Sequence, residues 1–61
     1  MKLQKDKSYI LLIDIGAKKL TFHGTITDID STFVSFIDKY DVEKTYNINN
    51  IISFEEIQNG S

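Results

Sequence analysis

The segment from Leu20 to Asp28 constrains the fold of this chain more than any other. It reads LTFHGTITD, and apolar and polar side chains alternate along it. Because successive side chains of a β-strand point to opposite faces, one row faces a core and the other faces solvent. The row expected to face inward contains Leu20, Phe22, Gly24 and Ile26. Gly24 in that row predicts a strand that bends sharply where no side chain fits.

Four further segments have strand composition and are separated by short polar turns. We predict strands at Tyr9–Ile15, Thr32–Ile37, Val42–Ile48 and Ile51–Glu56, with a 3₁₀ turn near residues 47–50. The side chains expected to point inward are Tyr9, Leu11, Ile13, Ile15, Val34, Phe36, Val42, Tyr46 and Ile48. No window has the apolar spacing of an amphipathic helix. The sequence therefore predicts an all-β fold, a single small five-stranded antiparallel barrel.

The 61 residues leave room for one domain. We expect a polar N-terminal segment at residues 1–8, the barrel at residues 9–57 and a tail at residues 58–61. The N-terminal segment is expected to fray or to form one short helical turn, with Leu3 as the one side chain that docks.

The residue types exclude several chemistries. The chain has no Cys and a single His, which excludes disulfides, thiolate zinc sites and His-rich metal sites. Acidic side chains gather in the expected turns and could form a cation site or supply catalytic carboxylates: Asp28, Asp30, Asp38, Asp41 and Glu43. No calcium-loop spacing accompanies them, so solvated turn residues are the favoured interpretation. We expect no enzyme activity, no cofactor and no metal.

The net charge and the types of basic residue indicate which classes of partner are expected. The net charge is −2, the pI is about 5.1, and all seven basic residues are Lys. Arg is the usual residue for bidentate phosphate and guanine contacts, so its absence and the acidic balance disfavour nucleic acid. A basic edge could still form from Lys2, Lys5, Lys7, Lys18 and Lys19. No apolar run is long enough to span a membrane, and we expect a cytoplasmic protein.

The strands carry more apolar surface than one small barrel interior can hold. Four side chains fall on strand faces opposite the expected core: Ile10, Leu12, Phe33 and Ile37. Exposed apolar patches mark contact surfaces. We therefore predict that the protein self-associates or binds a protein partner through these residues.

The order of residues in LTFHGTITDIDSTFVSFIDKYDVEKTYNINNIISFEE resembles that of the Sm-like family of SH3-like small barrels. Gly24, Ile26 and Asp30 match the glycine, apolar residue and turn aspartate of that family. Phe33 and Val34 stand where the family's RNA-contacting Asn is expected, and Asn49-Asn50 stands in place of its Arg-Gly pair. The resemblance implies a barrel that pairs edge strands between subunits, often into rings.

Two main hypotheses about function follow, and the first is a non-catalytic binding or assembly module that self-associates. The alternative is an Sm-like protein that binds RNA or another nucleic acid. Residues that could contact nucleic acid or a partner are Lys18, Lys19, His23, Tyr40, Asn49 and Asn50. A small regulatory or mobile-element protein that works only inside a larger complex is a third hypothesis, which the sequence does not separate from the first.

Overall fold

The computed structural model describes residues 3–57 and contains five strands there. They are β1 (Ser8–Asp14), β2 (Lys19–Ile29), β3 (Phe33–Asp38), β4 (Glu43–Asn47) and β5 (Ile51–Glu56), with the 3₁₀ helix η1 (Ile48–Asn50) before the last. The all-β prediction is confirmed, as is the 3₁₀ turn, and each predicted strand boundary lies within one residue of the observed one. The predicted tail at 58–61, together with Met1 and Lys2, lies outside the described residues.

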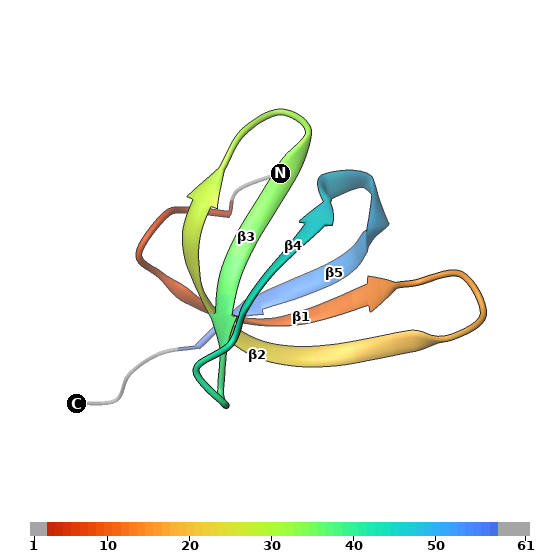
Figure 1. Cartoon of the computed structure of the whole chain (residues 1–61), viewed down its shortest axis with the longest axis horizontal. Helices are drawn as coiled ribbons and strands as arrows, with labels where there is room; N and C mark the ends of the chain where they lie inside the picture. Colours follow the sequence, from red (N-terminus) through yellow and green to blue (C-terminus); the bar gives the residue numbers. More distant parts are fainter. Residues whose placement is uncertain (1–2, 58–61) are drawn as a thin grey trace.

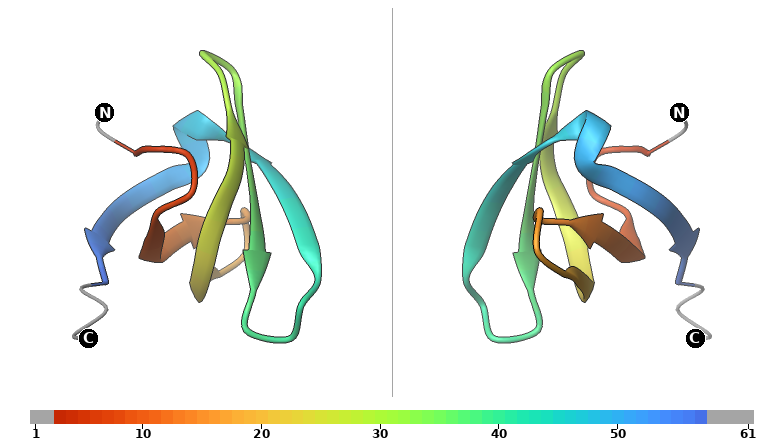
Figure 2. Two further views of the ribbon diagram at one scale, coloured as in Figure 1. Left: turned by 90° about the vertical axis from the view of Figure 1, so that its left-hand side faces the viewer. Right: turned by 90° about the vertical axis from the view of Figure 1, so that its right-hand side faces the viewer.

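All five strands belong to one antiparallel sheet in the order β4-β3-β2-β1-β5 (Figure 1). Four antiparallel steps separate β4 from β5, so these two edge strands run in the same direction. A parallel pair needs a crossover of about a dozen residues or more, whereas η1 has three. Within residues 3–57 the sheet accordingly has two edges and is not closed, and β4 and β5 lie on opposite sides of it in both views of Figure 2.

The long strand β2 links the two halves of the sheet. Its residues Lys19 to Thr25 pair with β1, while Gly24 to Ile29 pair with β3. A Cβ atom on Gly24 would lie 2.5 Å from Cδ2 of Phe36, so the buried Phe36 ring occupies the space that a side chain would need. This close approach is the reason for glycine in the inward row.

The core lies on the concave side of the sheet and is entirely apolar. Its buried side chains are Leu3, Tyr9, Leu11, Ile13, Ile26, Val34, Phe36 and Ile51. Five half-buried side chains pack against them: Phe22, Ile29, Tyr46, Ile48 and Phe54. Most of the predicted inward residues thus face the core.

Two predicted inward residues are exposed instead. Ile15 is 39% exposed and Val42 is 48% exposed. β1 ends at Asp14, whose carboxylate accepts the N–H of Gly16 as the chain turns. Val42 follows Asp41, which has a positive φ of 66°, and so belongs to the β3–β4 turn. Both corrections arise at turns, because the first turn begins one residue earlier and the second ends one residue later than the alternation alone indicates.

The N-terminal segment is neither frayed nor helical between residues 3 and 7. The N–H of Asp6 donates to the carbonyl of Ile26 at 2.8 Å, and the N–H of Ile26 donates to the carbonyl of Lys7 at 2.9 Å. The Tyr9 hydroxyl accepts the N–H of Gln4, and Leu3 is buried, as predicted. β2 extends beyond the start of β1, and the segment pairs with this overhang.

Candidate functional site

The structure divides the six predicted contact residues between separate regions. Lys18 and Lys19 stand at the end of the β1–β2 turn, where β2 begins. Asn49 and Asn50 are exposed in η1, which follows the far end of β4. Only His23 and Tyr40 come together, because both line one pocket.

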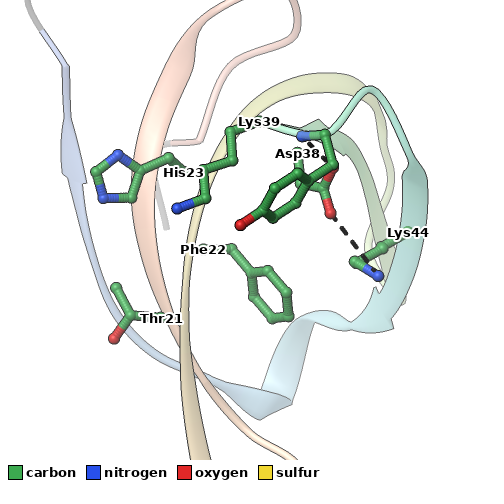
Figure 3. Close-up of a pocket in the computed structure, with 7 residues that line it drawn as sticks. Thr21, Phe22, His23, Asp38, Lys39 and Lys44 are labelled. Atoms are coloured by element: carbon green, nitrogen blue, oxygen red, sulfur yellow. Dashed lines mark hydrogen bonds and ion pairs between the residues drawn. The ribbon is translucent and has the colours of Figure 1, made fainter.

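This pocket has a volume of about 540 Å³ and lies where β2 meets the β3–β4 turn (Figure 3). Its lining consists of Thr21, Phe22, His23, Asp38, Lys39, Tyr40 and Lys44. Alternation along β2 puts Phe22 on the inner face and His23 on the outer face. Figure 3 shows these two rings on opposite sides of the strand, so the pocket surrounds the edge of β2.

Asp38 organises the wall of the pocket formed by the turn. Its Oδ1 accepts the N–H of Tyr40 at 2.9 Å and the N–H of Val42 at 3.1 Å. Its Oδ2 lies 3.8 Å from Nζ of Lys44, and the side chain is only 7% exposed. Burial acts to raise the pKa of Asp38, but the two backbone donors and the Lys44 ammonium together hold it below its ordinary value of 3.8. Asp38 is thus ionised, and its carboxylate is already engaged by two N–H groups of the turn and by Lys44.

Two ammonium groups border the pocket, and that of Lys44 is also the ion-pair partner of Asp38. Lys39 is exposed, and its Nζ lies 5.2 Å from the Tyr40 ring centroid. Nζ of Lys44 lies 5.8 Å from the Phe22 centroid. Cations at these distances are attracted to the ring faces, which orients both side chains over the pocket. Its lining holds two lysines and one aspartate, so the pocket has a net positive charge.

A cluster of three packed aromatic rings supports the floor of the pocket. The Phe22 centroid lies 5.4 Å from that of Phe36 and 5.7 Å from that of Tyr46, and Phe36 and Tyr46 are 6.1 Å apart. Phe36 is fully buried, so this cluster ties the pocket to the core. The floor is therefore held by packing that does not depend on a ligand.

The sequence did not mark Phe22, Lys39 or Lys44 as parts of a site, and it marked Asp38 only as one of the acidic turn residues. These residues come together through the strand register. Gly24 pairs with Asp38, so the β3–β4 turn lies beside the part of β2 that bears His23. An exposed aromatic residue beside Lys in a turn, as in Lys39-Tyr40, was the one local signal.

The four predicted self-association residues do not form one patch. Ile10 and Leu12 lie on the outer face of β1, opposite His23 and Thr21 of β2. Ile37 lies near one end of β3 and Phe33 begins the other end, opposite Asn47 of β4. Phe33 is 50% exposed, and the other three are half-buried. Phe33 thus lies beside the β4 edge and not beside Ile10 and Leu12 of β1.

The acidic turn residues do not gather around a common point. Within residues 3–57, no three His, Asp or Glu side chains are placed to hold a metal ion. The Asp30 carboxylate instead accepts the N–H groups of Phe33 and Thr32, each at 2.7 Å. These two hydrogen bonds lower the pKa of Asp30 from its ordinary value of 3.8, and burial opposes them.

We expect the free energy of unfolding to fall as the pH drops below about 4. A carboxylate whose pKa is lowered by folding stabilises the protein above its unfolded pKa and loses that contribution as the pH falls through the folded pKa. The Asp30→Asn/Asp38→Asn variant keeps both Oδ1 acceptors but does not titrate, so its stability should depend less on pH. Urea unfolding between about pH 2 and about pH 7 measures this. Identical pH profiles for the two proteins would contradict the prediction.

The chain matches no protein-family model, no curated protein and no solved structure at a significant level. Within residues 3–57, no helix has the length and apolar character needed to cross a membrane.

Proposed function

We propose that the protein is a non-catalytic assembly module whose copies join through the free edges of β4 and β5. One observation carries this proposal: both edges of the sheet are unpaired between residues 3 and 57, and each is flanked by large apolar side chains. Ile52 on β5 is 48% exposed, and Val42 and Phe33 beside β4 are 48% and 50% exposed. An edge of this kind is a template for pairing with another chain.

The direction of the backbone groups supports pairing at both edges. The N–H of Ile48 donates to Thr32 on the β3 side at 2.8 Å, and that of Ile57 donates to Ser8 on the β1 side at 2.9 Å. Alternate residues of a strand point their N–H and C=O groups to opposite sides. Odd-numbered residues of β4 and Phe54 and Glu56 of β5 therefore direct their backbone groups away from the sheet.

The small size of the domain favours assembly as well. A chain of 61 residues buries only about 60% of the surface that it exposes when unfolded. Without Cys it has no disulfide to compensate, and oligomerisation is a common alternative. A second copy that pairs with an edge satisfies backbone groups and covers Ile52 or Phe33 at the same time.

The proposal extends to the type of fold and its relatives. Five antiparallel strands with a 3₁₀ turn before the last support a small barrel-like fold of the SH3-like or Sm-like type whose sheet is left open. Edge pairing is the mode of assembly that the Sm-like resemblance implies. RNA binding is the weaker alternative. Its predicted contacts divide between the pocket of His23 and Tyr40 and the distant Asn49 and Asn50.

The experiment is a comparison of two variants at one position of the β4 edge. We expect light scattering at high concentration to give the wild-type protein a mass above the 7.0 kDa of one chain. Thr45→Pro removes an N–H that points to the free edge, and proline is tolerated at such a position on an edge strand. This variant should have a mass closer to that of one chain. Thr45→Val keeps the N–H and should assemble like the wild type.

The two variants are matched because Thr45 is exposed and both replacements remove its hydroxyl contact with Ser35 at 2.8 Å. Circular dichroism checks that each variant keeps its sheet. A strictly monomeric wild-type protein would refute self-association. Equal masses for Thr45→Pro and Thr45→Val would refute the β4 edge as the interface.

A further inference from the structure

Besides the two outer edges at β4 and β5, the first half of β2 is also unpaired on one side, because β3 does not extend along it. β3 pairs with β2 only as far as Gly24, which lies opposite Asp38. The chain then turns away into β4, so the stretch from Lys19 to His23 has β1 on one side and no strand on the other within residues 3–57. In Figure 1 this half of β2 extends with β1 as an arm of the sheet beyond the ends of β3 and β4.

The hydrogen bonds on either side of this stretch show which backbone groups face the gap. The N–H of Ile26 donates to Lys7 on the β1 side, and the carbonyl of Lys18 accepts the N–H of Ile15 on the same side. Even-numbered residues of β2 therefore bond towards β1. The N–H and C=O groups of Thr21 and His23 point the other way, and both residues line the pocket described above.

A lysine side chain lies on each face of β2 beside this edge, so a strand paired here would meet a lysine on both of its faces. Lys44 lies on the inner face, over Phe22. Lys39 borders the outer face, because it also lines a smaller hollow with His23, Thr25 and Ile37. An extended peptide beside β2 would direct alternate side chains to these two faces, and each face presents an ammonium group.

We propose that the β2 edge at Thr21 and His23 binds an extended acidic peptide segment of a protein partner as an added strand. Backbone pairing to Thr21 and His23 supplies the attachment, and this mode of recognition takes its specificity from alternate side chains. Glutamate or aspartate side chains on either face meet Lys39 or Lys44. The aliphatic part of such a side chain can lie against Phe22 or Tyr40.

The lysines should also restrict which strands can pair with this edge. Charged side chains, Lys above all, protect exposed strand edges against neutral strands. Lys18 and Lys19 extend the same charge along the start of β2. A basic strand would be repelled by these ammonium groups, and a neutral strand would cover Lys39 without supplying a counter-charge, whereas an acidic strand supplies one.

This site is independent of the proposed self-association, which uses the β4 and β5 edges. The test therefore uses the Thr45→Pro protein as well as the wild type, and both should bind alike. The probe is a blocked peptide of about seven residues with alternating Thr and Glu, titrated at low salt and observed by NMR. We expect slower hydrogen exchange at the amides of Thr21 and His23, and little change at Phe22, which already bonds to β1.

Peptide controls separate backbone pairing from charge attraction. N-methylation of alternate residues removes the N–H groups on one side of the peptide only. One methylated set should abolish binding and the other should leave it, since a single edge pairs with β2. A peptide of alternating Thr and Lys should not bind, and binding of the Glu peptide should weaken as salt is added.

Two protein variants locate the charge. Lys39→Glu should weaken binding of the Glu peptide about tenfold or more, whereas Lys5→Glu, an exposed lysine outside both pockets, should change it little. Equal binding by both methylated peptides, or absence of protection at Thr21 and His23, would overturn strand addition. Binding of oligouridylate at these amides without binding of the peptide would also overturn it and would make the pocket a nucleic-acid site.

Discussion

Replacing Phe36 by alanine is expected to lower the free energy of unfolding by about 3–5 kcal/mol. Phe36 is fully buried, its ring stacks with that of Tyr46, and it packs at a tilt against Phe22. The change leaves a cavity that the surrounding strands, held in register on both sides of β3, can close only in part. Because a domain of 61 residues is stable by roughly 3–9 kcal/mol, a large share of the variant should be unfolded at 25 °C.

Phe33→Ala is the matched control, because it removes the same side chain from the same strand. Phe33 is 50% exposed, and surface substitutions usually change stability by about 0.5 kcal/mol or less. Urea unfolding followed by circular dichroism compares the two variants at a protein concentration where both are monomeric, because Phe33 also flanks the proposed β4 assembly edge. Similar losses for both would contradict the position of Phe36 at the centre of the core. Because the Phe36 ring also packs against Phe22, its loss should loosen the packing that holds the floor of the pocket.

Gly24→Ala is expected to lower the free energy of unfolding by about 1–3 kcal/mol, the usual cost of adding a group to a packed core. The new Cβ would lie 2.5 Å from Cδ2 of Phe36 and 3.1 Å from the carbonyl oxygen of Ile37. The ring is confined by the core and the carbonyl by the β2–β3 pairing, so neither can move freely. His23→Ala, one residue earlier on the exposed face, should change stability little.

A double-mutant cycle identifies the cause. In a Phe36→Leu background the ring atoms that meet the new Cβ are absent, so the cost of Gly24→Ala should fall. Residues in direct contact show non-additive effects of about 0.5–3 kcal/mol. If the cost of Gly24→Ala is the same in both backgrounds, the Phe36 ring is not what requires glycine at this position.

The free edges have different chemical characters, which bears on what each can bind. Exposed apolar side chains, Ile52 beside β5 and Val42 and Phe33 beside β4, flank the outer edges. The inner edge of β2 is flanked by Lys39 and Lys44 over aromatic rings. Apolar edges suit a second copy of this chain, because pairing covers their side chains. The cationic edge suits an acidic partner, so the two proposals place assembly and recognition at separate edges of one small sheet.

The strand pattern could be predicted from the sequence because it depends on local alternation. LTFHGTITD alone places Phe22, Gly24 and Ile26 on one face, and the burial of Ile26 and Gly24 follows. Predictions at strand ends were less accurate, as Ile15 and Val42 show. There the backbone conformation of one turn residue, Gly16 or Asp41, decides where alternation stops. The N-terminal pairing to Ile26 has no local signal, since it depends on how far β2 extends.

The pocket could be predicted only in part, for a related reason. His23 and Tyr40 stood out as an imidazole and an exposed ring, but nothing local connects them. Pairing of Gly24 with Asp38 brings them together and adds Lys39. Lys44 joins because β4 returns along β3, opposite Phe36. Each step is a contact between residues distant in sequence.

The sequence by itself determined the number of strands, the faces of most of them and the need for glycine at position 24, because these depend on residue types and their spacing by two. Tertiary structure alone decided that the sheet has open edges, that the N-terminal segment pairs with β2, and that the β2 edge lies inside a cationic pocket. The physical reason is that strand register, length and curvature arise from pairing between segments, and pairing is not a property of any one segment.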